Sequence, residues 1–393
     1  MRQILIILCL GLSISTYGQS TFKETFHSKV LNEDRVIRVH LPESFDKNES
    51  KRYNLILALD GEHMFYATIG NTEILSSEEV DVIPEVVVVG VDQNFVVEGN
   101  ESARWQDCDY NWTSGLPEKK GVKFLSFIST ELIPYLEDTY NTNSFITIVG
   151  HSLTANYINY FLLQDPMIFQ GFIGVSPYVP AALQDTLFKS ANGLDVPVFY
   201  YMSTGENDLT GHKDNLVSLD STYLSKSNNP QFHYEFSNYK KEDHMSLVNR
   251  SLPEALRFVY SDYSPIDEDE LGEIMLKEVD PIEYVNEKYN HINSLYHYEK
   301  SIRLNDLFFI SFLLESQENW TELKRLGQIT VDLYPDDSYG YYMIGKFEEN
   351  NGELENALEQ YELGYARLSE DVTNKDDFYE PITRVKELMN QKE

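Results

Sequence analysis

The chain has 393 residues, of which 42% are hydrophobic and 13% aromatic, and it carries a net charge of −33. This apolar content excludes a disordered chain, and the length favours one large domain accompanied by a smaller one. The acidic excess excludes nucleic acid as an expected partner, because binding phosphates requires a cationic surface. More than half of this excess lies beyond Ser264, so the two parts of the chain differ in electrostatic character.

Residues 1–19 are predicted to form a secretory signal peptide. Met1 and Arg2 precede an apolar run over Ile4–Leu12, and cleavage is expected near Gly18. The run is too short to span a bilayer comfortably, so we expect an exported protein, periplasmic or secreted, and not an integral membrane protein. Once the peptide is removed, Cys108 is the remaining cysteine, which excludes a disulfide within the chain.

Residues 20–263 alternate short β-type runs with helical segments. Near-continuous apolar runs separated by helices are typical of a doubly wound, mostly parallel sheet covered on both faces. In such a sheet, ligands bind beyond the carboxyl ends of the strands. The expected strands are Arg35–Leu41, Tyr53–Leu59, Glu85–Val91, Phe145–Val149, Gly171–Ser176, Val196–Met202 and Phe232–Tyr239, with a helix over Gly121–Tyr140.

The stretch Gly150–Thr154 nearly reproduces the G-x-S-x-G nucleophile elbow, with Thr154 where a second glycine is expected. A strand-like run precedes it and helical apolar spacing follows it up to Leu163, which is the strand, turn and helix context that the elbow requires. A five-residue pattern occurs often by chance, so these flanks carry the argument. Ser152 is therefore the candidate nucleophile, although a β-branched Thr154 is expected to crowd the contact between strand and helix.

A serine nucleophile needs a base and a group that orients the base, and in α/β-hydrolases the chain order is serine, acid, histidine. Asp208 follows the Val196–Met202 strand and is the favoured acid, with Glu206 and Asp214 as competitors. His244 lies in the loop after the last strand and is the candidate base. Each residue alone has a commoner interpretation, such as a turn residue, a helix cap or a solvated histidine. Their order and placement together favour a triad.

An oxyanion hole needs two backbone donors directed at the developing charge. We expect one from the amide of Leu153 and the other from the loop after Leu59, at Gly61 or Glu62. His63 in the same loop raises the possibility of a metal site. Because no second histidine or cysteine lies at ligand spacing from it, no metal site is predicted.

Several segments together resemble the putative esterase family that contains esterase D and the enterochelin (ferric siderophore) esterases. They are Tyr53–Gly61, Val89–Asp92, the Phe124–Tyr140 helix, Gly150–Ser152, Gly174–Pro177 and Asp243–Met245. The resemblance implies an α/β-hydrolase fold and a serine carboxylester hydrolase without a cofactor, with Ser152 as nucleophile, His244 as base and Asp208 as acid. Family members usually carry Gly-Gly where this chain has Thr154-Ala155, and we interpret the difference as a repacked elbow in an active enzyme.

The long loop after the Glu85–Val91 strand contains Arg104 and Asp107, where the family often has an arginine-aspartate pattern. Two interpretations of Arg104 stay open at this point. It is either a substrate-binding residue or a member of a surface salt bridge, a type of interaction that contributes little to stability.

Residues 264–393 are predicted to form a smaller all-α domain. The strand-rich pattern ends at the acidic, proline-containing stretch Ser264–Glu270, and Asp337–Glu370 resembles a tetratricopeptide repeat of about 34 residues. Asn305–Asp336 has a similar length and is expected to be a degenerate repeat. Because one repeat cannot normally stand alone, we expect this region to dock on the first domain or on another chain.

Two functions follow as hypotheses. The first is an exported esterase that cleaves a small acyl, aryl or siderophore-type ester through an acyl-enzyme on Ser152. The second is an exported binding or scaffold protein that retains an inactive hydrolase fold while its helical tail recruits a protein partner.

Overall fold

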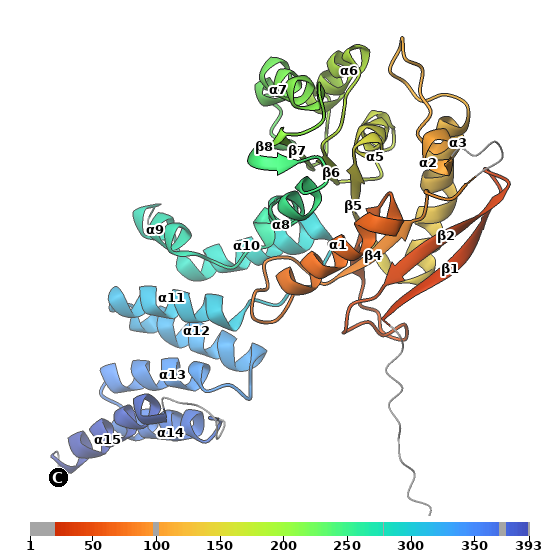
Figure 1. The fold of residues 1–393 in the computed structure, drawn as a ribbon. Helices are drawn as coiled ribbons and strands as arrows, with labels where there is room; N and C mark the ends of the chain where they lie inside the picture. Colours follow the sequence, from red (N-terminus) through yellow and green to blue (C-terminus); the bar gives the residue numbers. More distant parts are fainter. Residues whose placement is uncertain (1–19, 97–101, 278, 369–374, 392–393) are drawn as a thin grey trace, which may run out of the picture.

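The computed structural model describes residues 20–96, 102–277, 279–368 and 375–391, so the predicted signal peptide lies outside the described residues. Eight strands form a sheet in the order β1-β2-β4-β3-β5-β6-β7-β8 (Figure 1). β2 pairs antiparallel with both β1 and β4, and the pairs from β4 to β8 are parallel. The predicted α/β class with a mostly parallel sheet is confirmed. The strands are β1 Thr21–Ser28, β2 Glu33–His40, β3 Tyr53–Ala58, β4 Val86–Val91, β5 Thr142–His151, β6 Gly171–Val175, β7 Val198–Asn207 and β8 Phe232–Asp243.

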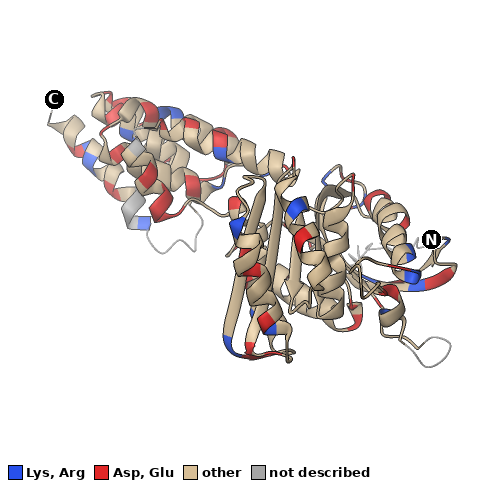
Figure 2. Cartoon of the chain, turned by 90° about the horizontal axis from the view of Figure 1, so that it is seen from above, with Lys and Arg blue, Asp and Glu red and all other residues tan. Residues whose placement is uncertain are grey.

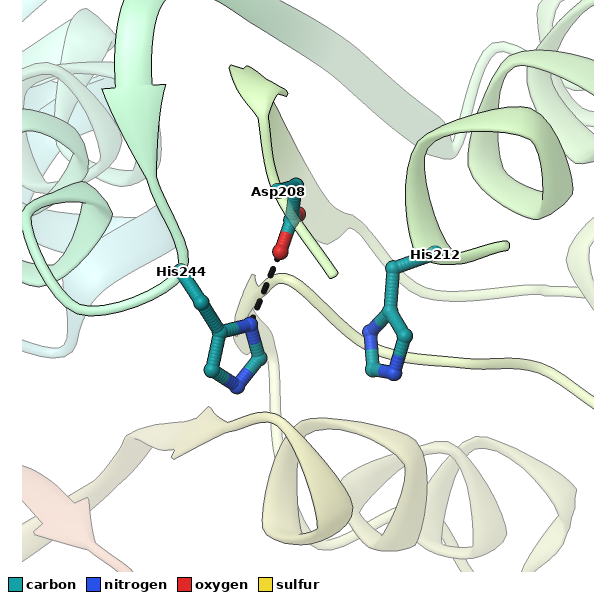
Figure 3. A group of neighbouring side chains, drawn as sticks. All are labelled: Asp208, His212 and His244. Carbon is teal, nitrogen blue, oxygen red and sulfur yellow. Dashed lines mark hydrogen bonds and ion pairs between the residues drawn. The ribbon is translucent and has the colours of Figure 1, made fainter. Parts of the chain in front are cut away.

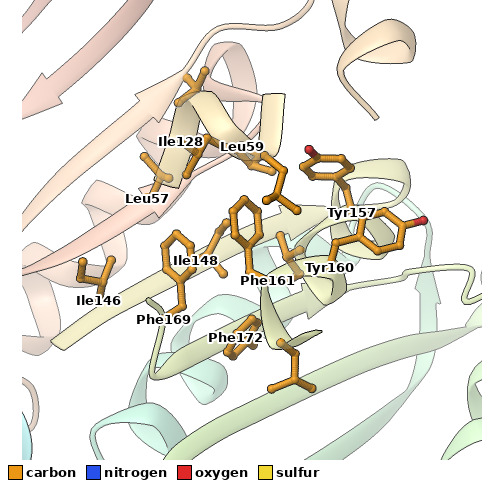
Figure 4. Close-up of a cluster of buried hydrophobic side chains, with 14 of the residues drawn as sticks. Leu57, Leu59, Ile128, Ile146, Ile148, Tyr157, Tyr160, Phe161, Phe169 and Phe172 are labelled. Atoms are coloured by element: carbon orange, nitrogen blue, oxygen red, sulfur yellow. The ribbon is translucent and has the colours of Figure 1, made fainter. Parts of the chain in front are cut away.

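The sheet has a hydrophobic core on each face. Leu55 and Leu57 of β3 enter one core while Ile56 and Ala58 enter the other, because side chains alternate across a strand. Figure 4 shows part of the first core, where aromatic residues such as Phe161 pack over the sheet. The first core is covered by α3 Lys120–Phe127, α4 Ile133–Thr139, α6 Ala181–Asn192 and α7 His212–Thr222, and the second by α1 Gly61–Leu75 and α8 Leu247–Val259.

The helix predicted over Gly121–Tyr140 is interrupted. A π-helical turn, Ile128–Leu132, separates α3 from α4. Pro134 lies in the first turn of α4 and has no amide hydrogen to donate into an uninterrupted α-helix. A wider turn before the proline is a local solution that lets both halves keep their apolar faces on the sheet.

β1 was not among the predicted strands. It forms the edge of the sheet, and its residues alternate between exposed and partly buried along most of its length. Continuous apolar runs, on which the predicted strands rest, belong to strands that are buried on both faces. An edge strand with one solvated face does not produce that signal.

The helical region is anchored in the core of the sheet domain by the end of α10 (Pro281–Tyr296). The Tyr296 ring is fully buried and lies 4.8 Å from the Phe145 ring, measured between centroids. The side-chain amides of Asn54 and Asn143 donate to the Tyr296 carbonyl at 2.7 and 3.2 Å. At the same junction Arg303 forms an ion pair with Asp81 at 2.6 Å. The helical region therefore docks on the sheet domain of its own chain.

Beyond α10 the helices stack in succession away from the sheet (Figure 1). They are α11 Leu304–Ser316, α12 Trp320–Leu333, α13 Tyr339–Asn350, α14 Leu354–Tyr365 and α15 Lys375–Asn390, while α9 Glu268–Lys277 precedes α10 in the chain. Gly345 on α13 faces the Tyr361 ring on α14 so closely that a Cβ there would lie 2.6 Å from it. Figure 2 shows acidic residues spread over these helices. In the parts of the chain that the structure describes, no helix is long and apolar enough to cross a membrane.

Candidate active site

Ser152 lies in the sharp turn between β5 and α5 (Leu153–Tyr157), with φ 60° and ψ −115°. Non-glycine residues rarely adopt a positive φ, and this strained turn is what raises the serine above the end of the sheet in a nucleophile elbow. The Ser152 amide donates to the Val175 carbonyl at 2.9 Å, which ties the turn to β6. A Cβ at Gly150 would lie 2.6 Å from the carbonyl carbon of Thr154, so glycine is required there.

Thr154 does not crowd the elbow, because the close approach of strand and helix occurs at Gly150. Its side chain is fully buried, and its hydroxyl accepts a hydrogen bond from the His151 amide at 2.9 Å. The same hydroxyl donates to Asp60 Oδ2 at 2.7 Å. Thr154 thus links the turn to the loop after β3 by hydrogen bonds. The elbow is repacked around Thr154, and these hydrogen bonds stabilise it.

Arg104 is engaged in the same cluster. Its guanidinium binds both carboxylate oxygens of Asp60, at 2.6 and 2.9 Å, and donates to the His151 carbonyl at 3.0 Å. The Arg104 side chain is 16% exposed and that of Asp60 is fully buried, so this ion pair is not the surface salt bridge considered from the sequence. These contacts place Arg104 beneath the elbow as a support for the Ser152 turn.

Asp208 and His244 meet beyond the ends of β7 and β8. Asp208 Oδ1 lies 2.8 Å from His244 Nδ1 (Figure 3), and the Asp208 side chain is fully buried while that of His244 is 15% exposed. Since a carboxylate only accepts, Nδ1 carries the proton and Nε2 is left as the basic nitrogen. No hydrogen bond joins His244 to Ser152 among the described residues, and in free enzymes such contacts are often long until a substrate binds.

The carboxylate of Asp208 is held ionised by its surroundings. Burial by itself would raise the pKa of Asp208, but hydrogen bonds from His244, Ser176 and Thr204 and from the Leu209 amide outweigh burial and lower it well below its ordinary value. The Ser176 and Thr204 hydroxyls donate to Oδ2 at 2.7 and 2.8 Å. A permanently charged acid is what stabilises a protonated histidine during acyl transfer.

The two competing acids lie elsewhere. Glu206 is exposed and accepts from the Lys241 amide at 3.1 Å. Asp214 is exposed in the first turn of α7. Of the three acids that the sequence left open, Asp208 is therefore the one that the structure pairs with His244.

Sequence reasoning missed Ser176 and His212. Ser176 follows β6 with φ 51°, and its hydroxyl lies 3.0 Å from His244 Nδ1 and 3.3 Å from His212 Nδ1. The Gly174–Pro177 segment resembles the family, but nothing in its sequence indicates a contact with the acid and the histidine. His212, the first residue of α7, had no motif around it.

His151, which precedes the nucleophile, supports the His244 loop. Its Nε2 lies 2.9 Å from the His244 carbonyl, and because a carbonyl only accepts, this nitrogen is the donor. Burial and the neighbouring His244 lower the pKa of His151 to about 4, so its ring is neutral at neutral pH. A neutral ring beside the candidate base does not compete with it for a proton.

The residues expected to supply the oxyanion donors lie at the starts of two helices, and these helices follow two neighbouring strands of the sheet. Leu153 begins α5 after β5, and Gly61 begins α1 after β3, so their amides belong to first turns that lack intrahelical acceptors. The Glu62 carboxylate accepts from the amides of Gln93 and Asn94 at 3.1 and 2.7 Å. That contact fixes the start of α1 to the loop after β4.

A cavity of about 610 Å³ opens beside the elbow. It is lined by Leu153 and by residues of the segment between β4 and α3 and the start of α3. These are Trp105 and Gln106 of α2 (Ala103–Asp107), the loop residues Cys108, Asp109, Tyr110, Trp112 and Lys119, and Lys120 at the start of α3. Trp105 and Trp112 are 62% and 80% exposed. Exposed tryptophans at a cavity beside a candidate nucleophile present flat apolar surface to a ligand.

Two groups bear on metal binding. His63 lies beside His151, with 6.0 Å between ring centroids, and does not belong to the cluster of possible metal ligands found among the described residues. That cluster consists of Asp208, His212 and His244, each of which offers a ligand atom within 4.8 Å of the others. Its members are separated along the chain and come together only through the fold.

A mostly parallel sheet with a strained serine after β5, an acid after β7 and a histidine after β8 defines an α/β-hydrolase. The family model described as "Putative esterase" matches residues 28–255. The chain belongs to this putative esterase family.

Solved structures share the fold. An uncharacterised protein from Capnocytophaga ochracea is 22% identical with a TM-score of 0.76, and the match covers 93% of this chain and 99% of that one. An IroE-like serine hydrolase from Shewanella oneidensis is 20% identical with a TM-score of 0.58, covering 76% and 95%. The siderophore hydrolase EstA from Aspergillus nidulans is 17% identical with a TM-score of 0.50, covering 62% and 95%. A search of curated proteins found no match.

Proposed function

We propose that this chain is an exported serine carboxylester hydrolase that forms an acyl-enzyme on Ser152. The observation that carries the proposal is the 2.8 Å pair of Asp208 and His244, set at the same end of the sheet as the strained Ser152 turn. Membership of the putative esterase family supports an ester as the substrate.

In the proposed reaction, His244 Nε2 removes the proton of the Ser152 hydroxyl as its oxygen attacks the ester carbonyl. Asp208 holds the ring in the tautomer with its proton on Nδ1 and stabilises the positive charge that forms on it. The protonated ring then gives its proton to the leaving alkoxide, which departs as an alcohol. Water, activated by the same nitrogen, hydrolyses the acyl-enzyme and restores Ser152.

The negative charge of the tetrahedral intermediate needs donors that are already in place. The Leu153 amide supplies one, and the amide of Gly61 or Glu62 supplies the other. Their positions at the starts of α5 and α1 favour anionic groups, because helix N-termini carry partial positive charge.

The substrate is proposed to be a small acyl, aryl or siderophore-type ester. Trp105, Tyr110 and Trp112 give the cavity beside Leu153 an aromatic lining. The two lysines at its edge are already paired with carboxylates, Lys119 with Asp109 and Glu118, and Lys120 with Glu33 and Asp107. The aromatic lining suits a substrate that carries an aryl group. The names of an IroE-like hydrolase and a siderophore hydrolase among structures of this fold agree with that class.

A fluorophosphonate probe and p-nitrophenyl acetate test the reaction. Wild type is expected to become covalently labelled and to hydrolyse the ester, and Ser152→Ala is expected to do neither. Ser218→Ala is the matched control, because Ser218 is an exposed serine on α7. A folded wild type that the probe does not label would overturn the proposal. A panel of aryl, alkyl and catecholate esters then ranks substrates.

Export is part of the proposal and rests on residues 1–19 alone. The full chain expressed in a Gram-negative host is expected to appear in the periplasm or the medium with an N-terminus close to Gln19. Recovery of the uncleaved chain in the cytoplasm would contradict this.

Recruitment of a protein partner by the helical region is a second candidate function. Phe309 and Phe312 of α11 are 37% and 57% exposed, which is unusual for phenylalanines on a helix that packs against its neighbours. The test is Phe312→Asp in the full chain, which is expected to abolish partner capture without affecting ester hydrolysis. Truncation at Ser264 is unsuitable, because it removes Tyr296 from the hydrolase core.

A further inference from the structure

Three possible metal ligands converge beside the candidate nucleophile. Asp208 follows β7, His212 begins α7 and His244 follows β8, and each offers a ligand atom within 4.8 Å of the other two (Figure 3). The cluster is sheltered, since the side chain of Asp208 is fully buried and that of His244 is 15% exposed. Two imidazoles and one carboxylate form a donor set that zinc sites use when a fourth position is left for water.

The hydroxyl of Ser176 marks the centre of this cluster. It lies 2.7 Å from Asp208 Oδ2, 3.0 Å from His244 Nδ1 and 3.3 Å from His212 Nδ1. Zinc binds nitrogen and oxygen ligands at about 2.0–2.2 Å. An ion in this place therefore needs the Ser176 hydroxyl to turn away and the three ligand groups to close in by small side-chain movements.

His212 has no part in the proposed acyl transfer. Asp208 and His244 act through their mutual hydrogen bond, whereas the polar contacts of the His212 ring are with the Ser176 hydroxyl and with the Ser176 carbonyl at 3.1 Å. Its ring also packs against that of His244, with 5.3 Å between centroids. A second histidine beside the acid and the base therefore completes a metal-binding group that the acid and base alone would not form.

We propose that Asp208, His212 and His244 bind a divalent transition-metal ion of the zinc type, and that the ion inhibits ester hydrolysis. Binding does not depend on the proposed function, whereas inhibition rests on it. Imidazole nitrogens select zinc, copper and nickel over magnesium and calcium, which prefer oxygen ligands.

Inhibition follows from the tautomer of His244. When the ion takes Nδ1 of His244, the proton of the neutral ring moves to Nε2, with no net gain or loss of a proton. The Nδ1 proton that His212 donates to the Ser176 carbonyl moves to Nε2 of His212 in the same way. Nε2 of His244 then has no lone pair to accept the proton of Ser152, and Nδ1 of His244 no longer donates to Asp208. The ion therefore stops catalysis by replacing one hydrogen bond, without covering the cavity beside Leu153.

The test is isothermal titration of the chelator-treated full chain with zinc sulfate and, separately, magnesium sulfate. Wild type is expected to bind one zinc ion and no magnesium at this site. His212→Ala is expected to weaken zinc binding by about tenfold or more, since losses of that size follow even the removal of groups outside the ligand set. His27→Ala is the matched control, because it removes a histidine 2.7 Å from the carboxylate of Asp34 outside the cluster.

Ser152→Ala separates the two proposals. It is expected to bind zinc as wild type does, because Ser152 is not a ligand, while it loses hydrolysis. In wild type and His27→Ala, zinc is expected to inhibit p-nitrophenyl acetate hydrolysis at the concentrations at which it binds. Equal zinc affinity in wild type and in folded His212→Ala would overturn the site. If circular dichroism shows that His212→Ala is unfolded, His212→Asn replaces it under the same criterion.

Discussion

The hydroxyl of Thr154 donates a hydrogen bond to the buried carboxylate of Asp60 at 2.7 Å, although the two residues are 94 positions apart. Asp60 also binds Arg104 through both carboxylate oxygens. The residue that replaces a glycine of the elbow is therefore a member of a buried polar cluster beneath Ser152. Its contacts explain how the turn tolerates a β-branched residue and why we expect the elbow to function.

Thr154→Val is expected to destabilise the protein by about 1–3 kcal/mol, because a methyl group of similar size leaves the Asp60 oxygen and the His151 amide without this partner. Thr154→Ser retains the hydroxyl and is expected to stay close to wild type. Urea unfolding measures both. Equal stability of Thr154→Val and wild type would show that the hydroxyl contributes nothing.

Asp208→Asn is expected to lower kcat/KM by about 10³–10⁴-fold, because an amide can hold the His244 ring in the wrong tautomer. Glu206→Gln is the matched control and is expected to have no effect, since Glu206 is exposed and bonded to the Lys241 amide. Steady-state kinetics with p-nitrophenyl acetate compares the two. A larger loss in Glu206→Gln than in Asp208→Asn would transfer the acid role to Glu206.

The lowered pKa of His151 predicts a loss of stability in mild acid. The folded ring protonates near pH 4, whereas an unfolded histidine protonates near about pH 6.5. Between these values the unfolded state binds the extra proton, so stability falls as the pH decreases through this window and the loss is complete below it. The loss is about 3 kcal/mol.

Denaturant unfolding of wild type and His151→Asn at pH values from 7.5 to 4 measures this effect. The variant lacks the titrating ring, so its stability is expected to fall less steeply with decreasing pH, whatever its absolute stability. Parallel curves for the two proteins would assign the acid sensitivity to other groups.

Tyr296→Ala is expected to cost about 3–5 kcal/mol, because the ring is fully buried against Phe145. The same contact is expected to couple the helical region to the sheet domain, so wild type should unfold in one calorimetric transition. Tyr379→Ala, at a tyrosine that is 50% exposed, is the control. Two separate transitions in wild type would show that the docking is too weak to couple the two parts.

Local sequence pattern was sufficient to predict the buried parallel strands and the turn that carries Ser152. Buried parallel strands produce continuous apolar runs, and the glycine, serine and flanking periodicity around Ser152 specify a strand, a turn and a helix within about fifteen residues. The putative esterase family was also predicted, and it is confirmed by the match over residues 28–255. β1 was missed because an edge strand with a solvated face lacks the apolar run.

Contacts between distant residues were beyond local pattern. Asp208, Glu206 and Asp214 all carry carboxylates and lie close together in the chain, and only the register of β7 on β8 brings Asp208 to His244. Local pattern also does not predict that Arg104 binds Asp60 instead of facing solvent, or that Thr154 donates a hydrogen bond to Asp60.

By itself, the sequence determined the α/β class, the order of serine, acid and histidine, and the helical nature of residues beyond Ser264, because periodicity and turn chemistry act over a few residues. The tertiary structure alone decided which acid faces His244, what Thr154 binds and that His212 joins Asp208 and His244. Those outcomes depend on which loops meet at the carboxyl ends of neighbouring strands. Packing across the whole sheet determines which loops lie next to one another, and no single segment of the sequence encodes that arrangement.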